Sequence, residues 1–230
     1  MSRDALETLL SLTTRPVAIT FLPHPPDGVR RVARSEPAGC GYWRLAAEGN
    51  TFYTEAADHL GCPIGAHTHN VPMSSEKAAE LQGLVQIMVG LEYLTMHDVA
   101  SLPRRTDDFG VAVYAPLASA PLAPDVIMIR GNARQLMLLA EAGAAAGVAG
   151  AGPVMGRPTC AVVPEVIASA HTAASFGCVG NRVYTGATDD EAWFAIPGER
   201  LALVVEKLSI LVKANAALEA FHAARKAQPS

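Results

Sequence analysis

Charged and aromatic side chains are scarce in this sequence, at 17% and 6% of its 230 residues. Its 18 basic and 22 acidic side chains give a net charge of −4, so there is no surplus of positive charge with which to bind nucleic acid or an anionic membrane. Because half of the residues are hydrophobic, the composition also excludes a disordered chain. We therefore expect a globular protein with a single domain over residues 1–230.

Uninterrupted apolar runs are missing as well. The first ten residues contain Asp4 and Glu7, where a secretory signal would need a continuous apolar stretch. The most apolar run, residues 136–152, contains Glu141 and is rich in Ala and Gly, which is unlike a membrane span. We therefore expect a cytoplasmic protein without a membrane segment.

Apolar periodicity and turn residues predict both helices and strands. We expect strands at residues 17–22, 51–54, 110–115, 126–130 and 159–163, and helices at 4–12, 42–48, 74–91, 133–146, 165–172 and 198–226. The two kinds of element do not alternate strictly, so the pattern favours an α+β fold in which helices flank a mixed sheet. The helix at 74–91 is predicted to pack through one apolar face. The last helix is apolar around much of its circumference, which suits either a core helix or contact with a second copy in a homo-oligomer.

The densest group of chemically useful side chains lies between residues 59 and 69. It runs His59-Leu-Gly-Cys62-Pro-Ile-Gly65-Ala-His67-Thr-His69. Thiolate and imidazole are ligands that zinc, iron and copper prefer, and glycine lets the backbone approach an ion closely. The spacing does not match a zinc finger, so a buried Cys62 with solvated His67 and His69 is an equally good interpretation.

The sequence has four cysteines, Cys40, Cys62, Cys160 and Cys178. In a reducing compartment they are expected to be core thiols, metal or cluster ligands, or reactive thiols rather than disulfides. Four thiolates would satisfy an iron–sulfur cluster, although the short C-x-x-C runs of ferredoxins are absent. Alternatively, Cys62 or Cys178 could act as a catalytic thiol, activated by a nearby histidine or a helix N-terminus. Cys160, in a predicted apolar strand, also suits a core position.

Two weaker sequence patterns also indicate residues that could form a functional site. Leu60-Gly61-Cys62 in the first half resembles Phe176-Gly177-Cys178 in the second, and two related halves would bring both cysteine loops together. Separately, the strand-to-helix turn at Gly131 and Asn132 has free backbone N–H groups, and Arg182 could clamp a carboxylate or phosphate. These three residues predict a binding site for a small anionic or cofactor-like ligand.

Taken together, the motifs resemble a family of uncharacterised, mainly prokaryotic proteins, the domain of unknown function 169 (DUF169) family. The matching segments span nearly the whole chain: Pro16 to Phe21, Cys40 with Arg44-Leu-Ala46, Cys62 to Gly65, Tyr114-Ala-Pro116-Leu117, Pro124-Asp125-Val126, Arg130-Gly131-Asn132, Arg157-Pro-Thr-Cys160, Gly177-Cys178-Val-Gly180-Asn-Arg182 and Ala195-Ile-Pro197-Gly198. The resemblance implies one family-length domain and no established reaction. It also implies that the Cys and Gly loops belong together, whereas His67 and His69 depart from the family pattern.

The leading hypothesis is a site formed by Cys62 and Cys178, with Cys40, Cys160 and His59 as further ligands. It would bind zinc, haem or an iron–sulfur cluster for redox-type chemistry. A non-catalytic protein that binds a small ligand through Arg182, Gly131 and Asn132 is the first alternative, and a metal-free thiol enzyme is the second. The sequence does not identify a substrate or a reaction.

Overall fold

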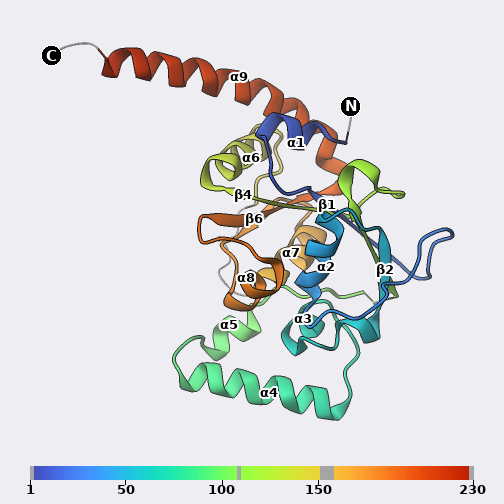
Figure 1. Cartoon of the computed structure of the whole chain (residues 1–230). Coiled ribbons are helices and arrows are strands. Elements are labelled where there is room, and N and C mark those ends of the chain that lie inside the picture. The colour runs from blue at the N-terminus through green and yellow to red at the C-terminus, as the bar shows by residue number, and fades with distance from the viewer. Residues whose placement is uncertain (1–2, 108–109, 151–157, 228–230) are drawn as a thin grey trace.

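The computed structural model describes residues 3–107, 110–150 and 158–227, and in these ranges six strands form one sheet with helices on both faces (Figure 1). The strands are β1 (Val17–Leu22), β2 (Phe52–Glu55), β3 (Val111–Pro116), β4 (Val126–Asn132), β5 (Ala173–Ser175) and β6 (Glu191–Pro197). Their order across the sheet is β2-β3-β1-β4-β6-β5, and each neighbouring pair is antiparallel. The predicted α+β class is confirmed. The sheet is antiparallel rather than mixed, because side-chain periodicity shows which face a residue occupies but not the direction of the neighbouring strand.

Both faces of the sheet are covered, so its central strands are apolar throughout. In β4, Val126 and Met128 pack into the hydrophobic core on one face, while Ile127 and Ile129 pack into the core on the other. This alternation follows from the two-residue period of a strand. The sheet is therefore the middle layer between two layers of helices.

The helices of the two outer layers come from different parts of the chain. One face carries α2 (Gly39–Ala47), α3 (Pro63–Thr68), α7 (Val162–Ser169) and α8 (Val179–Thr185), and the other carries α1 (Ala5–Leu10), α6 (Ala133–Ala145) and α9 (Leu201–Lys226) (Figure 1). The C-terminal part of α9 extends beyond the body of the protein, where Leu218 and Phe221 are exposed. No helix among the described residues is long and apolar enough to cross a membrane. Contact of α9 with a second copy stays a prediction.

The predicted strand at residues 159–163 is wrong. Thr159–Ala161 form a short 3₁₀ helix that continues directly into α7, so the helix predicted at 165–172 begins earlier, at Val162. The β-branched residues Val162 and Val163 favoured a strand, but Pro164 lies in the first turn of the helix, where its missing N–H costs no hydrogen bond. Helices also occur in two segments where none was predicted, since residues 56–72 contain α3 and residues 174–181 contain the start of α8.

Two helices lie apart from the layers. These are α4 (Ser75–Gly90) and α5 (Met96–Ala100), which lie at the far side of α3 and α8 from the sheet (Figure 1). The bounds of α4 match the predicted helix at 74–91, and Ser74 caps it as expected by accepting a hydrogen bond from the Lys77 N–H at 3.2 Å. Its packing differs from the prediction, since no residue of α4 is buried.

Candidate functional site

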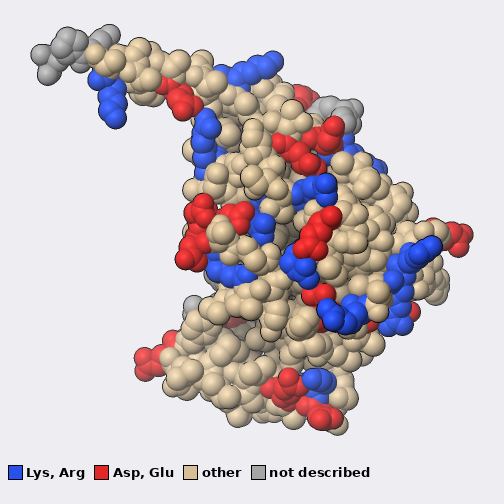
Figure 2. Space-filling model, in the orientation of Figure 1, with Lys and Arg blue, Asp and Glu red and all other residues tan. Residues whose placement is uncertain are grey.

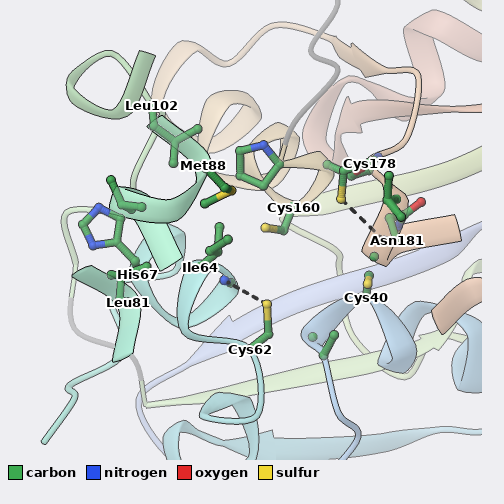
Figure 3. Close-up of a pocket in the computed structure, with 18 of the residues that line it drawn as sticks. Cys40, Cys62, Ile64, His67, Leu81, Met88, Leu102, Cys160, Cys178 and Asn181 are labelled. Atoms are coloured by element: carbon green, nitrogen blue, oxygen red, sulfur yellow. Dashed lines mark hydrogen bonds between the residues drawn. The ribbon is translucent and has the colours of Figure 1, made fainter. Parts of the chain in front are cut away.

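All four cysteines line one cavity of about 620 Å³ between the helical layer and α4–α5 (Figure 3). Its thiol-bearing wall is built from the first turn of α2, the N-termini of α3 and α8, and the 3₁₀ helix Thr159–Ala161. None of the four cysteines is in a disulfide. The volume falls in the range of small-molecule and cofactor sites, which is about 300 to 1,000 Å³. Four separate chain segments thus bring their thiols to a space that can hold a ligand.

Cys62 and Cys178 occupy equivalent positions in two similar turns. Each follows a glycine and is the N-cap of a short helix, and its sulfur accepts a backbone hydrogen bond of 3.4 Å, from Gly65 N–H in α3 and from Asn181 N–H in α8 (Figure 3). The structure therefore brings the two similar Gly-Cys loops of the sequence to one cavity. At both positions the sulfur satisfies an N–H group that a helix start would otherwise leave unpaired.

Cys40 and Cys160 complete the set from the other two segments. Cys40 is buried in the first turn of α2, and in Figure 3 it lies opposite Cys178. Cys160 is in the 3₁₀ helix, and its Sγ lies 3.4 Å from the Thr68 hydroxyl of α3. The neighbouring Thr159 hydroxyl accepts a 2.6 Å hydrogen bond from the Cys178 N–H, which ties the Cys160 segment to α8.

Burial keeps these thiols protonated. It raises the pKa of Cys40 to about 12 and also raises the pKa of Cys62 and of Cys160. Repulsion between neighbouring cysteines in their charged forms raises each of these pKa values further. A buried thiolate is costly without a positive charge beside it. In the metal-free protein these three cysteines are therefore neutral thiols at pH 7.

Asn181, the third residue of α8, has its side-chain amide buried between Trp193 and Cys40. The residue is 1% exposed, and its Oδ1 accepts a 2.6 Å hydrogen bond from the Trp193 indole N–H. The amide is also a hydrogen-bond donor to Cys40 and acts to lower the pKa of that thiol, against the effect of burial. A donor beside a buried sulfur favours negative charge on that sulfur. Asn181 belongs to one of the segments that resemble the DUF169 family, but the sequence gave no reason to select it, because a single asparagine forms no distinctive motif.

The three histidines of the 59–69 segment also line the cavity. His59 is buried, its Nε2 lies 2.8 Å from the Thr54 hydroxyl, and burial lowers its pKa to about 3. His69 is buried as well, and burial lowers its pKa to about 4, while His67 is less buried and its pKa is lowered to a smaller extent. Nevertheless, the described part of the chain contains no group of three or more His, Cys, Asp or Glu side chains that could hold a metal ion.

The residues predicted to bind an anion do not line this cavity. The Arg182 guanidinium donates hydrogen bonds to the backbone carbonyls of Phe176, Thr188 and Glu191. Asn132 is the N-cap of α6, where its Oδ1 accepts a 3.0 Å hydrogen bond from the Gln135 N–H, and the Gln135 side chain lies over Gly131. These groups hold turns and helix ends together.

The wall opposite the thiols comes from α4, α5 and the chain between and after them. Its lining side chains are Leu81, Val85, Met88, Tyr93, Leu94, Asp98, Val99 and Leu102. The sequence predicted a packing role for α4 and gave no sign that its apolar face would border a cavity, because a helical repeat of apolar residues is the same in both cases.

The comparisons identify a family. The DUF169 family model, described as uncharacterised ArCR, matches residues 5–207, so the chain belongs to this family. No curated protein and no solved structure matches the chain. The resemblance seen in the sequence is thereby confirmed.

Proposed function

We propose that this DUF169 protein binds an iron–sulfur cluster through the thiols of Cys40, Cys62, Cys160 and Cys178. One observation carries the proposal: all four cysteines of the chain, from four separate segments, line one cavity as free thiols. Four thiolates are the usual ligand set of such clusters, and a bound cluster would supply one-electron transfer. The function would then be redox chemistry at this site.

A cluster fits the cysteines better than a single ion does. Thiolates bound to one zinc ion lie about 2.3 Å from it, so their sulfurs are within about 4.6 Å of one another. No group of three or more potential ligands in the described ranges could hold one ion. Since iron and sulfide atoms lie between the thiolates of a cluster, those thiolates are farther apart than the ligands of one ion. We therefore propose a cluster, whose thiolates need not converge on one ion.

Hydrogen-bond donors around the sulfurs support the same assignment. The N–H groups of Gly65 and Asn181 donate to Cys62 and Cys178, and they lie at helix N-termini, whose partial positive charge favours a thiolate. The side-chain amide of Asn181 is a further donor, to Cys40. Donors to the sulfurs stabilise negative charge on a cluster and help to set its reduction potential.

The raised thiol pKa values argue against Cys40, Cys62 or Cys160 as the nucleophile of a metal-free thiol enzyme. A nucleophilic cysteine needs a lowered pKa, whereas burial raises the pKa of Cys40, Cys62 and Cys160. A bound cluster would overcome this obstacle, because the charge of its iron would stabilise the thiolates of these cysteines. The apolar surroundings then shield the bound group from water.

The test is the iron and acid-labile sulfide content of protein purified anaerobically without a His-tag. We expect iron and sulfide in equal amounts, a visible charge-transfer spectrum that dithionite bleaches, and loss of both elements in Cys62→Ser and Cys178→Ser. Val179→Ser is the matched control, because Val179 is the neighbour of Cys178, lines the cavity and is 71% exposed.

Other outcomes contradict the cluster and point elsewhere. Zinc without sulfide would indicate a single-ion site, and a haem spectrum would indicate haem. Protein that stays free of metal after anaerobic reconstitution with iron and sulfide, with all four thiols reduced when the protein is denatured and titrated, would overturn the proposal.

A further inference from the structure

We propose that the half of the cavity bounded by α4 and α5 binds an uncharged, mainly apolar organic molecule next to the thiols. This inference goes beyond the proposed cluster and depends on different residues. Figure 3 shows the two halves: Cys40 and Cys178 lie on one side, Leu81, Met88 and Leu102 on the other, and Cys160 between them.

The chemistry of the α4–α5 wall specifies an apolar ligand. It consists of aliphatic side chains, one methionine, Tyr93 and Asp98, and no Lys or Arg is among the described residues that line the cavity. A carboxylate or phosphate would therefore find no cationic partner there. The Asp98 carboxylate caps α5, since its Oδ2 accepts hydrogen bonds from the Thr95 N–H at 2.7 Å and hydroxyl at 2.9 Å.

The exposure of α4 indicates that its inner face lacks an apolar partner within the described chain. Leu81, Val85 and Met88 are spaced by four and three residues, so they share one face of the helix, and all three line the cavity. No residue of α4 is buried. An apolar molecule in this space would remove about 25 cal/mol of unfavourable hydration for each Å² of side chain that it covers.

His67 is a polar group that lines this side of the cavity together with Tyr93 and Asp98, and Figure 3 shows His67 beside Leu81. Burial lowers its pKa, with a smaller contribution from the positive charge of Arg104, so the ring is neutral at pH 7. A neutral imidazole can donate or accept one hydrogen bond. The expected ligand thus has an apolar body and an uncharged polar group, such as a hydroxyl or carbonyl, directed at His67.

The neutral fluorescent probe N-phenyl-1-naphthylamine tests this site in the full chain. We expect saturable binding with enhanced fluorescence, weakened about tenfold or more in Met88→Trp, which fills the space, and in Leu81→Gln, which makes it polar. Ile87→Trp is the matched control: Ile87 precedes Met88, is 60% exposed and does not line the cavity. Circular dichroism would establish that each variant remains folded.

Two results would overturn the inference. One is the absence of saturable probe binding by the wild-type protein. The other is equal binding by Met88→Trp and wild type together with a loss in Ile87→Lys, which would place the probe on the outer face of α4. That face is largely uncharged in Figure 2 apart from a charged group at one end.

Iron measured on the same samples separates this inference from the proposed function. If Met88→Trp loses probe binding but keeps its iron, and Cys62→Ser loses iron but keeps probe binding, the two sites are independent and both proposals stand. Wild-type protein that binds the probe but contains no iron would overturn the cluster and leave the ligand site in place.

Discussion

The Trp193 indole N–H donates a buried 2.6 Å hydrogen bond to Asn181 Oδ1, and this bond fixes which end of the amide points to the cavity. Trp193 lies in β6, and its ring meets that of Trp43 edge-on, with ring centroids 5.1 Å apart. Trp43 is in α2, the helix that also carries Cys40, and α2 packs against α8. A pair of tryptophans thereby anchors two thiol-bearing segments to the sheet. Such support by large, well-packed side chains is what a preformed ligand site requires.

This arrangement predicts that Asn181→Asp weakens the cluster. Aspartate still accepts the Trp193 hydrogen bond, but a carboxylate oxygen replaces the Nδ2 donor on the Cys40 side of the cavity. Its negative charge opposes four thiolates, so we expect iron affinity to fall roughly tenfold or more and any remaining cluster to have a more negative reduction potential. Iron analysis and an electrochemical titration measure both effects. Asn215→Asp, in α9, is the control, and equal iron content and potential in wild type and Asn181→Asp would refute the role of the amide.

The capping roles of the two Gly-Cys loops predict a difference between serine and alanine substitutions. In Cys178→Ser the hydroxyl can still accept the Asn181 N–H and serine is a preferred N-cap, whereas Cys178→Ala leaves that N–H unpaired. We expect the metal-free Ala variant to be about 1 kcal/mol less stable than the Ser variant in urea unfolding. Both variants should lack iron. Equal unfolding free energies would show that the sulfur cap contributes nothing.

The sequence predicted the parts of this structure that depend on local pattern. The strand at 17–22 and the helix at 74–91 came from periodicity and flanking residues, and the likeness of the two Gly-Cys loops indicated that they meet. The strand order could not be predicted, because pairing β1 with both β3 and β4 depends on contacts far apart in the chain. The cavity was missed for a similar reason. The apolar repeat of α4 does not reveal whether its face meets side chains or a space, and the Asn181 amide is oriented only when β6 supplies Trp193.

The buried histidines predict that the metal-free protein loses stability as the pH falls below about 6.5, the ordinary pKa of histidine. Burial lowers the pKa of His59 to about 3 and of His69 to about 4, so in this range the unfolded chain binds protons that the folded protein does not. Because the unfolded state binds more protons, the free energy of unfolding decreases with decreasing pH. From pH 7 to pH 5 the loss should be about 2 kcal/mol for each ring.

Urea unfolding between pH 7 and pH 5 measures this effect. The quantity to compare is the slope of the free energy of unfolding against pH. His69→Gln should show a shallower slope whatever its stability at pH 7, while the exposed His97→Gln should keep the wild-type slope. Asp58 does not interfere in this range. Burial acts to raise its pKa, but hydrogen bonds from the Glu55 N–H, Ser35 and Arg31 outweigh burial and leave the pKa below 3.8. A slope that His69→Gln does not change would show that this ring takes up protons equally in the folded and the unfolded protein.

The close packing of Gly61, the residue immediately before Cys62, predicts that a substitution there lowers the amount of bound iron. A Cβ at this position would lie 2.8 Å from the Pro37 carbonyl oxygen and 3.0 Å from that of Glu36, and neither backbone atom can move without displacing the segment that leads to Cys40. We therefore expect Gly61→Ala to shift the turns of both Cys62 and Cys40 and to lower the bound iron. Gly83→Ala in α4 is the matched control, because no atom lies within 4 Å of its Cβ and alanine favours a helix by about 0.5 to 1 kcal/mol. Full iron content in both variants would mean that the close approach at Gly61 does not position the cysteines.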